Sequence, residues 1–208
     1  MMPNRLIILM LVFVGEFSAV CTAEDWPIFR GPRGDGVTNQ SLPTQWDADK
    51  NIAWRTEIPG EGWSSPVTAG NRIYLTAAIP TGERDEDQKK QAYTLSLIIL
   101  DAASGKILKT IPIMEQTGER PTRIHRKNSH ASPTPVVEGD RIYVHFGYQG
   151  TACLTLNGEV LWKNRELYFK PTHGNGGSPV LASGNLIFTC DGDAEPKIVA
   201  LNAANGQL

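Results

Sequence analysis

This sequence lacks the features that mark several common functional classes. Its 20 Lys and Arg residues are outweighed by 22 Asp and Glu residues, so nucleic-acid binding has no electrostatic support. It contains no Gly-x-Ser-x-Gly, no Walker-type loop and no His-Glu-x-x-His, so hydrolase and nucleotide-binding functions lack their local signatures. Its apolar N-terminal run, Leu6–Gly15, is too short to cross a hydrocarbon core ~30 Å thick.

That apolar run predicts a secretory signal peptide over residues 1–23. Arg5 supplies a positive charge before the run, and Cys21-Thr22-Ala23 places small residues at a cleavage site. We therefore expect an exported protein, periplasmic or secreted, that is not transmembrane after cleavage. Lipid attachment at Cys21 is the alternative, although Ser18-Ala19-Val20 makes a poor lipoprotein site.

Cysteine is scarce, and cleavage of the leader would leave Cys153 and Cys190. An oxidising compartment permits a disulfide between them. The alternative is that both are small, buried apolar side chains. The sequence leaves the choice open because it does not place the two Cα atoms within bonding range.

What the chain does contain is a unit that occurs three times. Each copy begins with Ser or Thr followed by Pro-Val, continues through a Gly-containing turn into an apolar strand, and reaches a Leu-Asp or Leu-Asn turn. Repeats of this size predict small sheets that bury their faces against their neighbours. The copies begin at Ser65-Pro66-Val67, Thr134-Pro135-Val136 and Ser178-Pro179-Val180.

The second copy predicts four short antiparallel strands. Four such strands in a repeat of ~45 residues have the size of one β-propeller blade. We therefore expect an all-β chain in which an extended arm over 24–50 precedes a partial propeller of about three blades over 51–208. Ile52–Thr56 predicts a further outer strand. The predicted strands of the second copy are Thr134–Val137, Arg141–Phe146, Thr151–Leu156 and Glu159–Lys163.

Three blades do not close a ring that usually needs four to eight. We therefore expect this chain to be the N-terminal part of a longer protein, with the remaining blades missing. The first copy is also longer than the second, with insertions at Pro80–Ala92 and Pro112–Asn128. Both insertions fall on the same face of a four-stranded blade, which predicts a working face there. The alternative is a solvated charged loop at Gly82–Gln91.

The turn after the third strand of each unit carries a second motif. An Asp or Asn bonds amides within the turn, a Gly supplies a positive φ, and a Trp four residues later packs between blades. Lys109 replaces this Trp in the first copy, and Trp162 retains it in the second. The motif falls at Asp101–Gly105, Asn157–Gly158 and Asn202–Gly206.

Together with the Pro-Val strands, this turn motif resembles the PQQ-like β-propeller repeat family, named after pyrroloquinoline quinone. The chain is similar to quinoprotein alcohol dehydrogenase-like and BamB-like propellers and to exported members of planctomycete type. The resemblance implies one of two classes. One is the dehydrogenases that use PQQ and Ca²⁺, often with a disulfide between adjacent cysteines. The other is scaffold propellers that bind protein or peptide and carry no cofactor.

The sequence has no adjacent cysteine pair and no Ca²⁺ ligand set matched to the dehydrogenase pattern. We therefore expect a non-catalytic binding or scaffold module without a cofactor, acting on a protein or peptide partner. The alternative is a PQQ- and Ca²⁺-dependent alcohol or sugar dehydrogenase whose catalytic residues lie in missing blades. Fold alone does not decide between them.

The connections that enter the first strand of each unit supply the binding candidates. We expect them to converge at the mouth of the central channel. One alternative is a metal site formed by His125, His130 and His173, although their spacing is loose; another is turn chemistry with satisfied polar groups. Asp191, Asp193 and Glu195 are candidates for Ca²⁺, against an ordinary Asp-Gly turn. The binding-face candidates are Glu61, Trp63, Arg126, Lys127, His130, His173 and Asn175.

Overall fold

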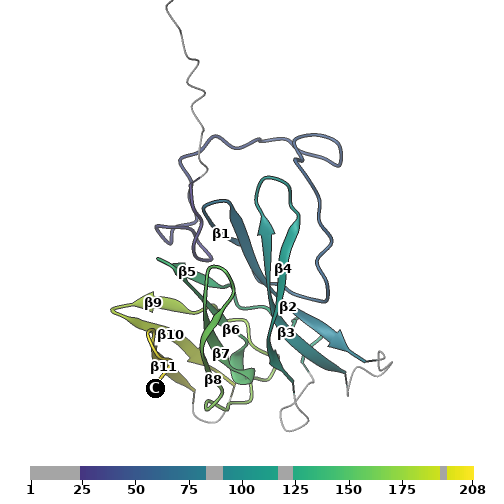
Figure 1. The fold of residues 1–208 in the computed structure, drawn as a ribbon. Coiled ribbons are helices and arrows are strands. Elements are labelled where there is room, and N and C mark those ends of the chain that lie inside the picture. The colour runs from purple at the N-terminus through teal and green to yellow at the C-terminus, as the bar shows by residue number, and fades with distance from the viewer. Residues whose placement is uncertain (1–23, 83–90, 117–123, 193–195) are drawn as a thin grey trace, which may run out of the picture.

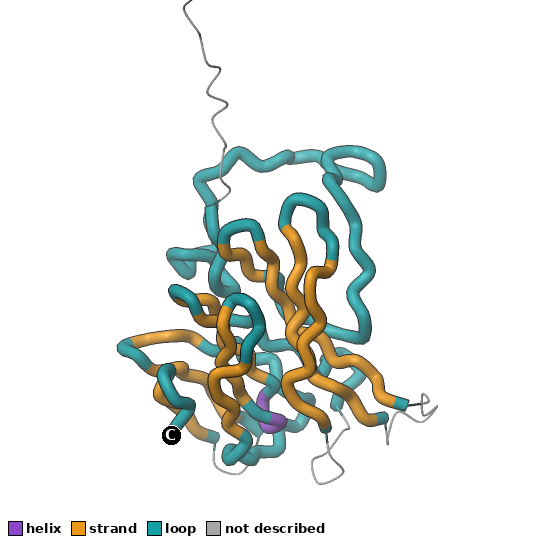
Figure 2. Tube along the Cα trace, in the orientation of Figure 1, coloured by secondary structure: helices purple, strands orange, loops and turns teal. Residues whose placement is uncertain are grey.

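The computed structural model describes residues 24–82, 91–116, 124–192 and 196–208. Three antiparallel sheets follow one another along this part of the chain (Figure 1). One short 3-10 helix, η1 (Gly147–Gln149), is the helical element of the described residues (Figure 2). The predicted all-β class is therefore confirmed, whereas the predicted signal peptide and Cys21 lie outside the described residues.

Each sheet is a meander whose strands pair in chain order, and we call the three sheets blades 1 to 3. The ring they form is not closed. Blades 1 and 2 have four strands each, and blade 3 has three. Their strands are β1 (Val67–Ala69), β2 (Arg72–Thr81), β3 (Ala92–Asp101), β4 (Ile107–Glu115), β5 (Val136–Glu138), β6 (Arg141–His145), β7 (Thr151–Thr155), β8 (Val160–Asn164), β9 (Val180–Ala182), β10 (Asn185–Cys190) and β11 (Lys197–Asn202).

The predicted insertion at Pro80–Ala92 is partly strand. β2 and β3 have 10 residues each, whereas β6 and β7 have 5 each. Pro80 pairs with Tyr93 and Thr81 with Ala92, so the inserted residues begin by lengthening the hairpin. The far ends of β2 and β4 lie on the side of the sheets where η1 also lies (Figures 1 and 2).

The hydrophobic core lies between the blades. The largest cluster joins Tyr74 and Leu97 of blade 1 to Ile142 and Leu154 of blade 2, all of them at most 1% exposed. Smaller clusters join blade 2 to blade 3, for example Tyr143 to Leu186. Each fully buried side chain of this size contributes ~1.5–3 kcal/mol relative to exposure. A blade is therefore stabilised mainly by its neighbours.

Trp162 attaches blade 2 to the turn that ends blade 3. Its Nε1–H donates to the Ala203 carbonyl at 3.0 Å, and its ring lies where a side chain on Gly206 would project. Gly206 has φ +74, a conformation that favours glycine. The turn motif and the docked indole therefore belong to one inter-blade contact.

Similar contacts occur on the turns of blades 1 and 2. The Trp54 indole donates to the Ala102 carbonyl at 3.0 Å and lies against Gly105, the glycine of the blade 1 turn. In blade 2 the Lys109 ammonium donates to the Asn157 carbonyl at 2.8 Å. A cation thus takes the place of the indole where the sequence has lysine.

The predicted strand at Ile52–Thr56 is wrong, because these residues form no ladder. Two side chains attach the segment to the turn of blade 1. The Trp54 indole donates to the Ala102 carbonyl, and the Thr56 hydroxyl donates to the Gly105 carbonyl at 2.6 Å. A strand requires a neighbouring backbone to pair with, and the described residues place none beside this segment.

In the third unit the glycine of the first turn lies one residue later than in the other two units. Gly70 and Gly139 hold φ +56 and +59 at the first turn position of blades 1 and 2. The same position in blade 3 is Ser183, at φ +50, and Gly184 follows it at φ +74. The middle residues of the three inner strands are therefore Thr68, Val137 and Leu181.

Candidate functional site

The Ser/Thr-Pro-Val motifs of the three blades are joined side by side. The Thr134 hydroxyl accepts the Ser65 N–H at 3.1 Å, and the Ser178 hydroxyl accepts the Thr134 N–H at 3.0 Å. The motifs of blades 2 and 3 thus each supply the acceptor for a backbone N–H of the preceding blade. The proline that follows holds the chain extended at this point. The sequence motif therefore has an inter-blade role, and it forms one wall of the space between the blades.

The arm crosses the inner edges of blades 1 and 2. The Thr68 N–H donates to the Trp26 carbonyl and the Val137 N–H to the Pro27 carbonyl, each at 2.9 Å. The arm then reverses at Gly31, which has φ +74 and lies directly under the Trp26 ring. A Cβ at this position would lie 2.7 Å from the Trp26 ring, so the close packing requires glycine here.

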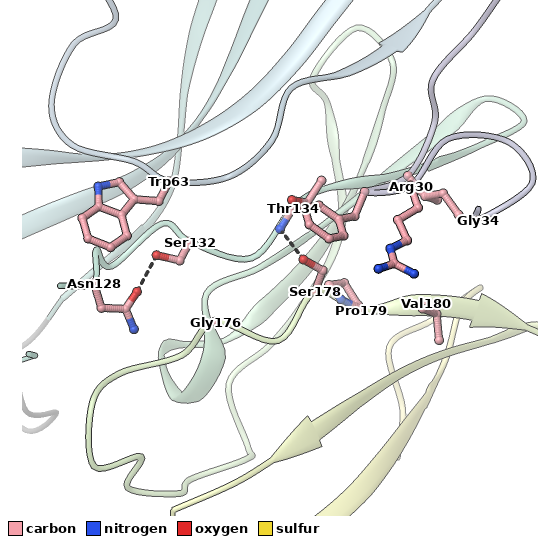
Figure 3. A pocket seen from close by; sticks show the side chains of 12 residues that line it. Arg30, Gly34, Trp63, Asn128, Ser132, Thr134, Gly176, Ser178, Pro179 and Val180 are labelled. Atoms are coloured by element: carbon pink, nitrogen blue, oxygen red, sulfur yellow. Dashed lines mark hydrogen bonds between the residues drawn. The ribbon is translucent and has the colours of Figure 1, made fainter. Parts of the chain in front are cut away.

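A cavity of about 520 Å³ lies between the arm and the inner segments of the three blades (Figure 3). Trp63 and Asn128 lie at one end, and Arg30 and Val180 lie at the other. Trp63 is 58% exposed. Arg30 is the one charged side chain among the described residues that line the cavity. The lining is otherwise apolar or hydroxyl- and amide-bearing, which suits a neutral or anionic ligand.

Asn128 connects the segment before blade 2 to the segment before blade 3. Its side-chain Nδ2 donates to the carbonyls of His173 and Asn175 at 3.0 and 3.3 Å. Its Oδ1 accepts from the Ser129 N–H at 2.9 Å and from the Ser132 hydroxyl at 2.6 Å. An amide can do this because it carries both donors and an acceptor. Sequence reasoning noticed the loop but did not select Asn128.

The three candidate histidines do not come together. The His125 and His173 rings meet edge to face with centroids 5.1 Å apart. His130 instead packs on Tyr93 at 4.9 Å, and its Nδ1 lies 2.9 Å from the Gln116 side-chain nitrogen. Across the described ranges, no group of three His, Cys, Asp or Glu side chains is placed to hold a metal ion.

The remaining binding-face candidates occupy different environments. Glu61 pairs by backbone with Ala78, with hydrogen bonds of 2.9 and 2.7 Å, and its side chain is not part of the cavity wall. Arg126 and Lys127 are exposed in a turn and do not line the cavity either. Of the predicted candidates, Trp63 is therefore the one that faces the cavity directly.

Asn175 lines a second, smaller hollow of about 40 Å³ together with His145 and Asp191. His145 is 2% exposed, its Nδ1 lies 2.8 Å from the Thr151 hydroxyl, and burial lowers its pKa to about 3. Asp191 accepts the Thr189 hydroxyl at 2.8 Å. Asp193 and Glu195 lie outside the described residues.

Cys153 and Cys190 form no disulfide and are buried in different clusters. Cys153 packs beside Tyr143, and Cys190 packs in the cluster that contains Phe188. Burial raises the pKa of the Cys153 thiol to about 11. In this structure both side chains serve as small apolar groups, one of the two possibilities that the sequence left open.

Repeated four-stranded sheets, their docked turns and a channel-lining motif define the chain as a β-propeller repeat protein. A family model described as outer membrane protein assembly factor BamB matches residues 37–208, and the chain belongs to this family. The predicted PQQ-like, BamB-like membership is therefore confirmed.

Among solved structures, the chain is similar to BamB from Moraxella catarrhalis, at 16% identity and a TM-score of 0.38. The match covers 73% of this chain and 46% of that one, so this chain spans about half of its length. No curated protein shows significant similarity to this chain. Within the described residues, no helix has the length and apolar character needed to span a membrane.

Proposed function

We propose that this protein is an exported, non-catalytic scaffold that holds a segment of a protein partner in the cavity between its blades. The observation that carries the proposal is Trp63, a large aromatic side chain left 58% exposed at the end of a cavity of about 520 Å³. Trp is among the residues that most often dominate binding energy at protein interfaces. Cavities of ~300–1,000 Å³ are typical of ligand sites.

The family supports this proposal. Its description names an assembly factor of the outer membrane, which is a role exercised on other proteins. Export is consistent with that description, and the predicted signal peptide would provide it. The partner in this proposal is a protein or peptide, as the sequence analysis expected.

A PQQ and Ca²⁺ site does not fit the cavity. Calcium is bound by six to eight oxygen ligands that usually include carboxylates. The described residues that line the cavity contribute no carboxylate, and their one charged group is the Arg30 guanidinium. The described cavity lining therefore offers no Ca²⁺ ligand set, and no reaction step is assigned to the cavity.

Site-specific photo-crosslinking tests the proposal. A benzophenone amino acid replaces Trp63 in one variant and Leu108 in a control, because Leu108 is 46% exposed but lies on β4 and does not line the cavity. Irradiation of the producing cells is expected to give a discrete protein adduct at position 63 and none at 108. Equal adducts at both positions, or none at 63, would contradict the proposal.

A further inference from the structure

The arm demonstrates how the inner edges of the blades bind an extended backbone. Thr68 and Val137 occupy the same place in β1 and β5, where they pair with Ile73 and Ile142. Their N–H groups face away from the sheet and donate to successive carbonyls of the arm, those of Trp26 and Pro27. The arm thus advances by one residue for each blade that it crosses.

The equivalent position in blade 3 is open. Leu181 pairs with Leu186 as Thr68 pairs with Ile73, so its N–H faces the channel in the same way. Within the described chain no acceptor is present for this N–H. The next carbonyl of the arm, that of Ile28, accepts the Gly31 N–H at 2.9 Å where the arm turns, and it makes no hydrogen bond to Leu181. The arm leaves the third edge free.

The residues around this free edge favour an anionic ligand. Val180, the first residue of β9, is 53% exposed. The Arg30 side chain extends toward Ser178 and Val180 across the cavity (Figure 3). Its guanidinium has no carboxylate partner among the described residues. A cation beside an unpaired strand edge is complementary to an extended backbone that carries an acidic side chain.

We propose that the channel edge of β9 and Arg30 form the docking site for an extended acidic peptide segment. The Leu181 N–H donates to a carbonyl of the segment, as Thr68 and Val137 donate to the arm, and the Arg30 guanidinium binds a carboxylate of the same segment. This inference rests on the proposed scaffold function and names the chemistry of its partner.

Amide hydrogen exchange and peptide titration test the inference on the purified protein. The probe is a capped hexapeptide of alternating threonine and valine in which one central residue is aspartate, compared with its asparagine counterpart. At saturation with the aspartate peptide, we expect exchange of the Leu181 amide to slow at least ~10-fold, because a hydrogen-bonded amide must open before it exchanges. The Thr68 and Val137 amides, already bonded to the arm, are expected to change little.

Two protein variants test the contribution of charge, while exchange of the Leu181 amide reports on the backbone contact. Arg30→Gln is expected to weaken binding of the aspartate peptide ~3- to 5-fold, because a partly exposed ion pair contributes about that much. The same variant should bind the aspartate and asparagine peptides equally well. Val180→Glu is expected to weaken it further by repulsion. Arg55→Gln, which removes an exposed charge outside the cavity wall, is the matched control and should leave binding unchanged.

Each outcome decides the question. Loss of selectivity in Arg30→Gln together with Leu181 protection supports the site. Failure of the aspartate peptide to bind, or binding without Leu181 protection, overturns it. Equal weakening by Arg55→Gln would also overturn it, because the charge would then act nonspecifically. The crosslinking at position 63 reports separately on the scaffold function, so an adduct there with a negative peptide result rejects this inference alone.

Discussion

Replacing Thr134 by valine tests the inter-blade role of the Ser/Thr-Pro-Val motif. Thr134 is 2% exposed, and its hydroxyl accepts the Ser65 N–H at 3.1 Å. Valine keeps the shape but removes the acceptor, and an amide left unpaired in a partly buried site costs ~1–3 kcal/mol. Thr134→Ser keeps the acceptor and loses one methyl group, which costs ~0.8 kcal/mol. We therefore expect Thr134→Val to be the less stable variant.

Urea unfolding measures the two stabilities, and hydrogen exchange at Ser65 measures the contact itself. The unfolding midpoint is expected to fall for both variants with an unchanged slope, and to fall further for valine. The Ser65 amide should exchange faster in Thr134→Val but not in Thr134→Ser. If valine proved as stable as serine and left Ser65 exchange unaltered, the hydroxyl would have no role in joining the blades.

Three further predictions concern the docked turn, the buried histidine and the thiols. Gly206→Ala should destabilise the protein by ~1–3 kcal/mol in urea and red-shift tryptophan emission, because its Cβ meets the Trp162 ring at φ +74; an unshifted spectrum would contradict the docking contact. Burial lowers the pKa of His145 to about 3 from 6.5, so the unfolded state binds the extra proton between these values. The free energy of unfolding should therefore fall by up to ~1.4 kcal/mol per pH unit below pH 6.5, and this histidine should not affect it above that pH. Urea titrations at each pH measure this dependence, which should be weaker in His145→Gln. Because Cys153 and Cys190 are buried and not disulfide-bonded, neither should react with a thiol reagent at pH 8 until urea is added, when both should.

The blades could be predicted because their turns are local. The hairpin at Asn157–Gly158 and the repeated Pro-Val segments fix strand ends within a few residues, and all four predicted strands of blade 2 are present. The inner turn of blade 3 could not be aligned correctly, because Ser183 adopts a positive φ that sequence assigns to glycine. Ile52–Thr56 has strand composition but no strand to pair with, and strand formation depends on that partner.

The candidate site was harder to predict because its contacts join different blades. Trp63 could be placed at the cavity from its position before β1. His130 could not be separated from His125 and His173 by spacing, since the ring of Tyr93 and the amide of Gln116 hold it elsewhere. The Asn128 amide bonds the segment before blade 3 through its nitrogen and its own segment through its oxygen. No pattern in the neighbouring sequence indicates such a contact between distant segments, so Asn128 was not predicted.

The repeat limits what the channel can distinguish. Each blade has an equivalent inner-strand N–H, at Thr68, Val137 and Leu181, and the first two already bond the arm, so backbone pairing along the channel is alike from blade to blade. Such pairing supplies affinity for any extended chain but does not discriminate between sequences. Discrimination between acidic and neutral sequences must then come from a residue outside the repeat pattern, and the charged one at this cavity is Arg30 of the arm, whereas Trp63 offers apolar contact to any sequence. A Trp63→Ala variant should consequently lower affinity for all extended peptides, whereas Arg30→Gln should remove the preference for acidic ones, and peptide titration of the two variants separates these effects.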